Sequence, residues 1–457
     1  MTTRPQPQAA LDELADGIDE GRVLTAPESL EAYRHDFVPD PSAGMPCAVA
    51  LCASALDVQT ALRWATRHRV PVVTRGAGTG LSGGATAVEG CLVVSTAGLT
   101  SVRVDPAARV ADCGAGALNA SVKAAAAEHG LFYPPDPGSF RISTIGGNIA
   151  TNAGGLCCVK YGVTAAYVLG LDVVLADGTL LELGGRTIKN VAGLPLLPLF
   201  VGSEGTLGVI TRAHLRLLPA PPPASTVVAV FPTTRQAGEA VVAIGRTITT
   251  SMLELLDNRT INNVEDMRPS GLDRTAAALL VIQTDAAGSG RTEDAETVGR
   301  LCRDSGASEL YTTHDPAEGE QFVDIRRSTG PAVERRGALL PEDVGVPLDR
   351  LPHLLTRIER IAADLDVEIP VVAHAGDGNV HPTIVYGPDS HDRARTAFDR
   401  ILRAAVDLGG TITGEHGVGR AKRPALEAQV GSAVLEVSRR VKQVLDPDGL
   451  LNPGVLL

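Results

Sequence analysis

The chain has 457 residues, so two or three domains are expected rather than one core. A net charge of −12 argues against nucleic-acid binding, because it repels the phosphates. An aromatic content of 3% argues against it too, because few side chains are available to stack on bases. The seven cysteines show no disulfide or zinc-ribbon spacing, no run of about 18 apolar residues is present, and the start carries no signal peptide; a cytoplasmic protein is expected, with peripheral membrane attachment as the alternative.

The first half of the chain predicts an α+β region. Residues 1–44 predict a polar helical arm, with helical pattern over residues 10–36. Between residues 45 and 220, short β-rich runs are separated by turn residues, and two segments have helical spacing, 58–69 and 118–130. Many strands and few helices are therefore expected in this domain.

The second half of the chain predicts a different arrangement. A proline-rich run, LPAPPPAST, marks the first domain boundary near residue 220. Helices then alternate with strands over residues 221–424, which predicts an antiparallel sheet covered by helices. Residues 425–457 predict a helical C-terminal segment. The cationic side chains of Arg420, Lys422 and Arg423 just before it are expected to be surface charges or electrostatic steering groups.

The first of three glycine-rich blocks is GAGTGLSGG, residues 76–84. It contains GTGLSG, a formal match to the dinucleotide-binding fingerprint, but the fingerprint requires a helix directly afterwards, and here another strand follows. A Walker A motif is excluded because no Gly-Lys-Ser/Thr follows. A loop of backbone N–H groups between two strands is left, which suits a pyrophosphate.

The other two blocks are PPDPGSFRISTIGGNIATNAGG, residues 134–155, and FVGSEGTLGVIT, residues 200–211. The second block is a polar, glycine-studded stretch, and the third leads into a strand. Three such blocks within about 135 residues are better explained by an enclosed ligand with many hydrogen-bonding atoms than by structural loops alone.

A second group of polar residues lies beyond the proline-rich run. His374 and His381 bracket a Gly-Asp-Gly-Asn turn, so both imidazoles can face one cleft, and Glu415 is the obvious third ligand for a divalent ion such as zinc. The alternative is that these are hydrogen-bonded structural histidines. Their concentration beside two glycine-rich turns favours a functional site.

The three blocks, together with the C-terminal LDPDGLLNPG, resemble the FAD-binding domain of the vanillyl-alcohol oxidase/p-cresol methylhydroxylase family. The resemblance is greatest to its glycolate and D-lactate dehydrogenase branch, related to D-2-hydroxyglutarate dehydrogenase. It implies a two-subdomain FAD-binding domain, an antiparallel-sheet substrate domain with a metal site, and a C-terminal helical segment that packs back on the FAD domain. Thr79 stands where some relatives attach flavin through histidine, so non-covalent FAD is expected.

The resemblance also implies site residues. Those expected to hold FAD are Arg75, Gly76, Gly78, Thr79, Gly80, Ser82, Asp136, Ser139, Gly146, Asn152, Gly154, Ile210 and Asn452. His374, His381 and Glu415 resemble the family's metal ligands, His416 its catalytic base and Arg326 its substrate arginine. The expected reaction is loss of the hydroxyl proton of a 2-hydroxy acid to His416 and hydride transfer to flavin N5, with the carboxylate clamped by Arg326.

The segment LLPEDVGVPLDRLP, residues 339–352, resembles the D-lactate dehydrogenase version. The hydroxyglutarate enzymes usually have a lysine where Pro341 stands, so D-lactate or a similar small D-2-hydroxy acid is the expected substrate. Glycolate and D-2-hydroxyglutarate are kept as alternatives. Two other classes are also carried: a non-redox flavoprotein like the alkyl-dihydroxyacetone-phosphate synthases, and a metallohydrolase. The electron acceptor is open between quinone, electron-transfer flavoprotein, cytochrome and oxygen, and a homodimer is the hypothesis for the assembly.

Overall fold

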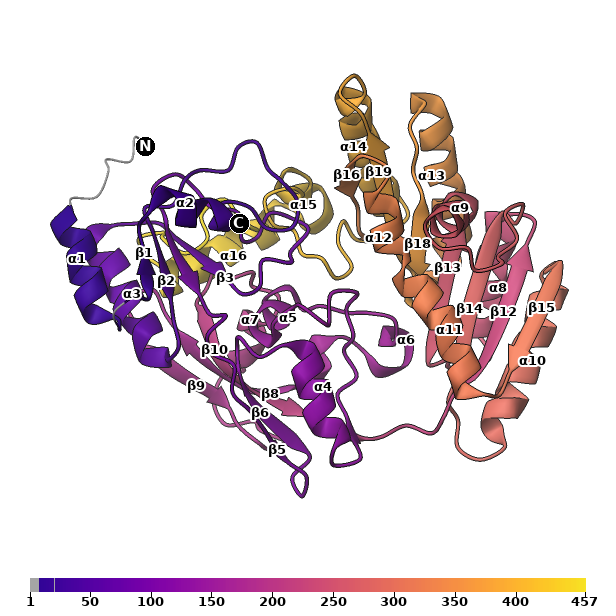
Figure 1. Ribbon diagram of the computed structural model, residues 1–457, viewed down its shortest axis with the longest axis horizontal. Coiled ribbons are helices and arrows are strands. Elements are labelled where there is room, and N and C mark those ends of the chain that lie inside the picture. Colours follow the sequence, from indigo (N-terminus) through magenta and orange to yellow (C-terminus); the bar gives the residue numbers. More distant parts are fainter. Residues whose placement is uncertain (1–7, 20) are drawn as a thin grey trace. The chain divides into compact units, whose positions relative to one another are not determined.

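The computed structural model describes residues 8–19 and 21–457 (Figure 1). Contacts between residues divide the chain into two compact units. The first unit comprises the described residues up to 153, with 163–220 and 415–457, and the second comprises 154–162 and 221–414. None of the helices among the described residues is both long enough and apolar enough to span a membrane.

The first unit contains a four-stranded sheet in the order β1-β2-β4-β3. The strands are β1 (Val23–Leu24), β2 (Ala48–Leu51), β3 (Val72–Arg75) and β4 (Leu92–Ser95), and β4 pairs parallel with both β2 and β3. Helix α3 (Ala55–His68) packs against it. It begins at a capping box between Ser54 and Asp57, buries Val58, Leu62 and Ala65, and ends at Arg69 in the left-handed conformation.

The predicted N-terminal arm is only partly helical. Helix α1 (Gln8–Gly17) packs on α3, but β1 pairs with β2 before α2 (Pro27–Leu30) and the short 3₁₀ helix η1 (Glu31–Tyr33) begin. Gly21 has a φ of +78°, which turns the chain between α1 and β1. The predicted helical stretch is therefore interrupted by a strand.

The second sheet of the first unit has five antiparallel strands in the order β5-β6-β10-β8-β9. They are β5 (Val102–Asp105), β6 (Val110–Gly114), β8 (Val168–Val174), β9 (Leu180–Gly184) and β10 (Val209–Arg216). Helices α4 (Asn119–Ala127) and α5 (Ile145–Thr151) cover it, and the fully buried Tyr133 and Phe200 belong to the core between them.

The remaining elements of the first unit are short, except at the C-terminus. They are β7 (Leu131–Phe132) paired with β11 (Leu218–Pro219), η2 (Thr164–Tyr167), α7 (Leu197–Phe200), α15 (Arg423–Val430) and α16 (Ser432–Leu445). The predicted helical tail is thus present as α15 and α16. Lys422, predicted on the surface, is only 2% exposed, which corrects that expectation.

The second unit is built on one eight-stranded antiparallel sheet in the order β15-β12-β14-β13-β18-β19-β16, with β17 also paired to β19. The strands are β12 (Ser225–Phe231), β13 (Met252–Asp257), β14 (Ala278–Thr284), β15 (Glu309–Thr313), β16 (Ala338–Pro341), β17 (Val344–Gly345), β18 (Val371–His374) and β19 (Asn379–Tyr386). This confirms the predicted antiparallel sheet.

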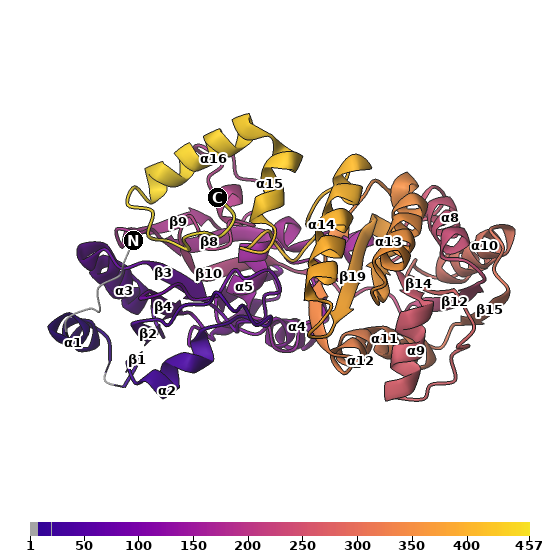
Figure 2. The ribbon, with the colours of Figure 1, turned by 90° about the horizontal axis from the view of Figure 1, so that it is seen from above.

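Helices cover both faces of this sheet (Figure 2). On one side lie α8 (Thr234–Gly245), α10 (Gly290–Asp304), α13 (Leu351–Leu365) and α14 (His391–Asp407), and on the other α9 (Asn258–Met267), α11 (Pro316–Arg327) and α12 (Thr329–Glu334). The short helices α6 (Cys158–Tyr161), η3 (Leu348–Arg350) and η4 (Ala375–Asp377) complete the unit. Because both faces are covered, the central strand β14 is almost wholly buried and reads as a continuous apolar run, ALLVIQT.

Candidate active site

The first glycine-rich block forms the loop between β3 and β4. No backbone N–H group of residues 76–82 donates a hydrogen bond to another residue in the described part of the chain. Gly78 has a φ of +72°, and a Cβ there would lie 2.2 Å from Nη2 of Arg75. Consecutive N–H groups without protein partners require other acceptors, and a concave row of them binds anions. The loop therefore fits the phosphate groups of a dinucleotide.

Arg75 and Asp36 lie beside the loop. The Nη1 group of Arg75 donates to the carbonyl oxygen of His35 at 2.5 Å, and its guanidinium lies 5.7 Å from the centre of the Tyr33 ring. Burial raises the pKa of the Asp36 carboxyl to about 6, although backbone N–H groups and Arg75 act in the opposite direction. The guanidinium of Arg75 thus has partners in the protein, and its predicted role in holding FAD stays a proposal.

The second block is not the extended loop that its glycines suggest, because it contains α5. The side chain of Thr144 caps α5 by accepting from the N–H of Gly147, and the helix ends at Asn152 with a φ of +53°. This block lies against the first, since a Cβ on Gly76 would be 2.3 Å from Oγ1 of Thr144. Only the absence of a side chain allows that approach.

The third block joins the same cluster. The N–H groups of Gly202 and Glu204 donate to Ile149 and Ala150 of α5 at 2.9 and 2.8 Å. Asn452, from the C-terminal motif, accepts from the N–H of Thr74 at 2.8 Å through Oδ1. Its Nδ2 group donates to the carbonyl oxygens of Gly84 at 3.1 Å and Glu204 at 2.7 Å. The four motifs singled out in the sequence are therefore assembled in one place.

Of the residues predicted to hold FAD, Gly154 alone belongs to the second unit, and all others belong to the first. Asp136 and Ile210 are buried, and Ser82, 4% exposed, faces the segment after His416. A Cβ on Gly146 would lie 2.7 Å from that of Ala115. These positions agree with a cofactor enclosed by backbone, and each individual contact with it stays a proposal.

The second unit carries the predicted histidines on the hairpin formed by β18, η4 and β19. His374 ends β18, and His381 pairs with Val372 two residues before it, so both side chains are on the same face of the hairpin. Their ring centroids are 4.9 Å apart, and the rings meet edge to face at 83°. The hairpin register brings together two imidazoles that are seven residues apart in the sequence.

A buried carboxylate fixes the orientation of His374. Glu254 on β13 pairs directly with His374 in the sheet, and its Oε1 and Oε2 lie 2.9 and 3.0 Å from Nδ1 of His374. Carboxylates commonly hold a metal-binding histidine in this way, because they set the ring's tautomer and increase its basicity. Glu254 was not predicted as a site residue; its only signal in the sequence is one acidic residue inside the apolar strand MLELLD.

The same carboxylate also binds Arg326 at the end of α11. The Nε group of Arg326 donates to Oε2 of Glu254 at 2.6 Å, and Nη1 lies 3.4 Å from Oγ1 of Thr329. Complete burial acts to raise the pKa of Glu254. The charges and hydrogen bonds of His374 and Arg326 act in the opposite direction and together outweigh burial, so the pKa lies below its ordinary value. A buried charge network results, in which Glu254 is ionised between two cationic or proton-donating partners.

Asp343, also fully buried, organises the region next to His381. Its Oδ1 accepts from Nδ2 of Asn379 at 2.7 Å and lies 3.6 Å from Nδ1 of His381. Its Oδ2 accepts from the hydroxyl of Thr413 at 2.7 Å and the N–H of Gly414 at 2.8 Å. Asp343 therefore fixes the chain up to Gly414. The next two residues, Glu415 and His416, are grouped with the first unit.

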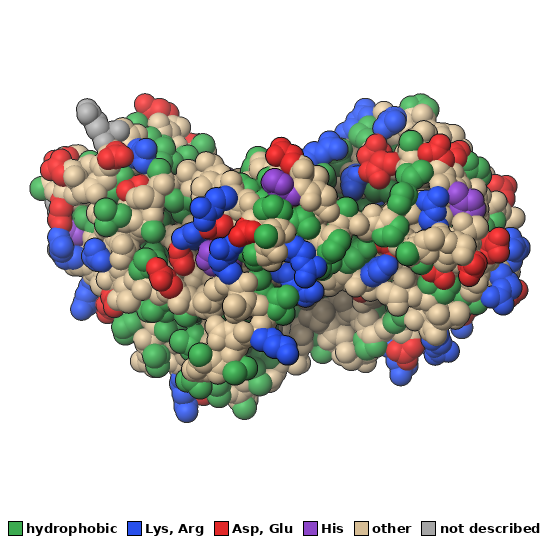
Figure 3. All heavy atoms as spheres, turned by 90° about the horizontal axis from the view of Figure 1, so that it is seen from below, with side chains coloured by type: hydrophobic (Ala, Val, Ile, Leu, Met, Phe, Trp, Pro, Cys, Tyr) green, Lys and Arg blue, Asp and Glu red, His purple; other side chains and the backbone are tan. Residues whose placement is uncertain are grey.

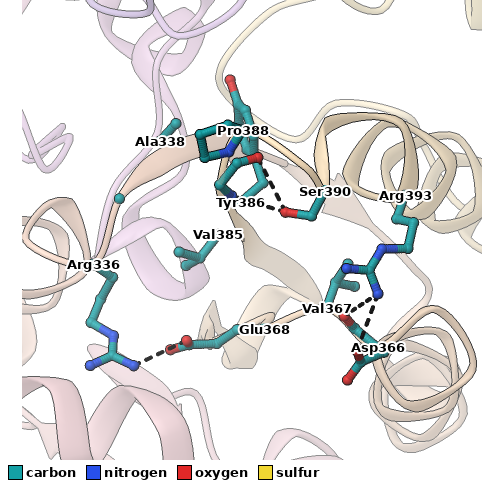
Figure 4. A pocket seen from close by; sticks show the side chains of 12 residues that line it. Arg336, Ala338, Asp366, Val367, Glu368, Val385, Tyr386, Pro388, Ser390 and Arg393 are labelled. Atoms are coloured by element: carbon teal, nitrogen blue, oxygen red, sulfur yellow. Dashed lines mark hydrogen bonds and ion pairs between the residues drawn. The ribbon is translucent and has the colours of Figure 1, made fainter.

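A separate hollow of about 530 Å³ lies in the second unit, around the ends of β16 and β19 (Figure 4). Its two arginines are both paired with carboxylates, Arg336 with Glu368 and Arg393 with Asp366. None of the predicted site residues lines it. On the face drawn in Figure 3, acidic and basic side chains are interspersed.

Comparisons with known proteins identify the family of the chain. Residues 46–184 match the family model of the FAD binding domain, and residues 220–456 that of the C-terminal domain of FAD linked oxidases. The chain is 38% identical over 428 residues to glycolate oxidase subunit GlcD of Bacillus subtilis, covering 92% of this chain and 91% of that one. It is 36% identical over 432 residues to D-lactate dehydrogenase of Archaeoglobus fulgidus, covering 93% and 95%.

The solved structure of p-cresol methylhydroxylase with substrate bound has a TM-score of 0.83 to this chain at 15% identity, and the match covers 98% of this chain and 96% of that one. At this identity the similarity shows the fold alone. It confirms the predicted fold of the vanillyl-alcohol oxidase/p-cresol methylhydroxylase type.

Proposed function

The chain belongs to the FAD-linked oxidase family and is an FAD-linked oxidoreductase of the 2-hydroxy acid type; on that premise we propose that its substrate is a small D-2-hydroxy acid, D-lactate foremost, which it converts to the 2-oxo acid. The observation that supports the proposal is the His374–Glu254–Arg326 network beside His381, because imidazoles are the side chains that commonly bind a metal and a guanidinium is the one that commonly binds a carboxylate.

FAD fits the first unit because the loop of residues 76–82 offers N–H groups that donate to no other described residue, between glycines that leave room for phosphate oxygens. Bound flavin supplies the two-electron acceptor for the hydride from substrate C2. Thr79, at the position where some relatives carry the linking histidine, provides no such attachment, which supports non-covalent binding.

His374, His381 and Glu415 are the proposed ligands of a divalent ion, zinc being the candidate that best suits two imidazoles and a carboxylate. Two observations support them: the edge-to-face pairing of the imidazoles and the contact from Glu254 to Nδ1 of His374. Such an ion supplies Lewis acidity, which lowers the pKa of a bound hydroxyl.

His416 is the proposed base, which takes the hydroxyl proton on a ring nitrogen. Arg326 is the proposed binding partner of the substrate carboxylate. Glu254 occupies its Nε edge, so its Nη2 group is the one directed to substrate in this proposal. Glu254 then has a double role, since it orients His374 and holds the guanidinium in place.

The choice of D-lactate is supported by the residue at position 341. Pro341, the last residue of β16, stands where the hydroxyglutarate enzymes usually have a lysine. A second substrate carboxylate buried without a positive partner is costly, whereas the methyl group of lactate needs none. Anaerobic mixing of the FAD-loaded protein with each hydroxy acid tests this directly: D-lactate should bleach the flavin absorbance fastest.

A further inference from the structure

Glu204, in the third glycine-rich block, is a buried carboxylate whose contacts are with backbone. It is 7% exposed and lies in the left-handed region with a φ of +51°. Its Oε1 accepts from the N–H of Val418 at 2.8 Å, and its Oε2 accepts from the N–H of Gly419 at 2.7 Å. These two N–H groups follow His416 by two and three residues, and all of these residues belong to the first unit.

Ser82, in the first glycine-rich block, holds the same segment from the side of the phosphate-binding loop. Its hydroxyl donates to the carbonyl oxygen of Gly417 at 2.9 Å. Its own carbonyl oxygen accepts from the N–H groups of Arg420 at 2.8 Å and Ala421 at 3.1 Å. Residues 417–421 are therefore joined to the loop that is proposed to bind the pyrophosphate of FAD.

The fit between these segments leaves no space for side chains at two positions. Gly419 has a φ of +53°, and a Cβ there would lie 1.9 Å from the carbonyl oxygen of Ser82. Gly417 has a φ of +87°, and its Cβ would lie 3.0 Å from Cδ of Glu204. Glycine at both positions permits this close approach and the positive φ values.

Glu204 is itself well anchored. Its N–H donates to Ala150 of α5, and its carbonyl oxygen accepts from Asn452 at 2.7 Å. The buried ammonium of Lys422 adds a favourable electrostatic interaction with the carboxylate. Because both the backbone and the side chain of Glu204 are held in place, the segment that its carboxylate binds is held in a defined position as well.

From this arrangement we propose that Glu204 and Ser82 are positioning residues, which fix the segment carrying Glu415 and His416 on the flavin-binding loop. This inference rests on the proposed function, because it assigns their effect to the base His416. Glu204 is not a catalytic residue, since its carboxylate contacts backbone N–H groups. Glu204 affects the reaction by positioning His416.

The test is a double-mutant cycle of Glu204→Gln and His416→Ala, measured as the rate constant of anaerobic flavin reduction by D-lactate. Glutamine keeps the size of Glu204 but turns one acceptor into a donor that faces an N–H group. With His416 present, the rate constant should fall about 10- to 100-fold at saturating substrate, with little change in the half-saturating concentration and in bound FAD. In the His416→Ala background the same change should add less than about twofold.

Equal losses in both backgrounds would overturn the proposal, because they would show a general structural effect rather than one exerted through His416. The control is Glu182→Gln, at an exposed position on β9 of the same unit, which should leave the rate unchanged. If Glu204→Gln does not fold, Ser82→Ala removes one contact of the segment and keeps the carbonyl acceptor, and the cycle is repeated with it.

Amide hydrogen exchange separates the positioning from the chemistry. In the FAD-loaded protein, a peptide that spans residues 415–421 should exchange faster in Glu204→Gln than in the wild type or in Glu182→Gln. Unchanged exchange would refute the proposed anchoring. If no 2-hydroxy acid reduces the wild-type flavin, the proposed function has failed, and this measurement still decides whether Glu204 holds the segment.

Discussion

Glu254 and His374 face each other directly on neighbouring antiparallel strands, and their side chains form a buried contact of 2.9 Å. The contact joins residues that are 120 positions apart in the sequence. It commits Nδ1 of His374 to the carboxylate, so the other ring nitrogen is the one proposed to bind the metal. The second oxygen of Glu254 binds Arg326, which connects the proposed metal site with the proposed substrate-binding group.

Glu254→Gln should weaken both functions of this network. The zinc affinity of the protein is expected to fall about 10- to 100-fold, because the imidazole loses the charge that orients it. Stability is expected to fall by about 3–5 kcal/mol, because Arg326 is left buried without its counter-charge. Zinc titration and urea unfolding measure the two effects. Normal zinc affinity together with normal stability would show that the network has neither role.

Gly78→Ala should weaken FAD binding. The left-handed φ of +72° disfavours alanine by about 1–2 kcal/mol, and its Cβ would collide with Arg75, which distorts the loop that offers its N–H groups to the pyrophosphate. Gly185→Ala is the matched control, because that residue has open space around it and no positive φ. Fluorescence titration of the apoprotein with FAD measures the dissociation constants. Equal affinities for both variants would exclude the loop from the binding site.

The stability of the apoprotein should depend on pH through Asp36. Burial raises the pKa of this carboxyl from 3.8 to about 6, so between these pH values the folded state binds more protons than the unfolded state. The contribution of Asp36 to stability is therefore full below about pH 4 and is lost as the pH rises through 6.

Asp36→Asn should reduce the fall in stability over this pH range, as followed by urea unfolding of the apoprotein. The dependence should not vanish, because burial also raises the pKa of Asp257 to about 6 and that of Glu204 to about 7. A variant whose stability changes with pH as steeply as that of the wild type would contradict the assignment.

Local sequence patterns predicted much of the fold. Most strands of the four-stranded and five-stranded sheets, and half of those of the eight-stranded sheet, appear as β-rich runs between turn residues. Helical spacing over residues 58–69 predicted most of α3, which begins three residues earlier, after the cap at Ser54. Helix α5 was not predicted, because its first turn is Ile-Gly-Gly-Asn and two glycines have low helix propensity, even though Thr144 before them caps the helix. The structure shows that helix packing on the sheet outweighs the low helix propensity of this segment.

The charged partners of the site could not be predicted in the same way. Glu254 is one carboxylate in an apolar strand, and its partners are set by the register between β13 and β18 and by the position of α11. Lys422 looks like part of a surface cluster in Arg-Ala-Lys-Arg, yet it is buried. Tertiary contacts across more than 70 residues determine these environments, and no local pattern records them.

His416→Ala should retain FAD and lose flavin reduction. Removal of a general base is expected to lower the rate constant about 10²- to 10⁴-fold, while the glycine-rich loops that hold the cofactor are unchanged. The absorbance spectrum of the purified variant reports the bound flavin, and stopped-flow mixing with D-lactate reports the rate. Reduction at the wild-type rate would remove His416 from the mechanism.

The most direct test of the proposed function is the rate of anaerobic flavin reduction in the FAD-loaded wild type, compared between D-lactate, L-lactate, glycolate and D-2-hydroxyglutarate. We expect the flavin absorbance to bleach with every small D-2-hydroxy acid that fits the site, fastest with D-lactate. D-2-hydroxyglutarate should be much slower, because Pro341 supplies no cation for its second carboxylate. Faster reduction by D-2-hydroxyglutarate than by D-lactate would contradict the proposed substrate. A flavin that none of the four acids reduces would contradict the proposed reaction itself.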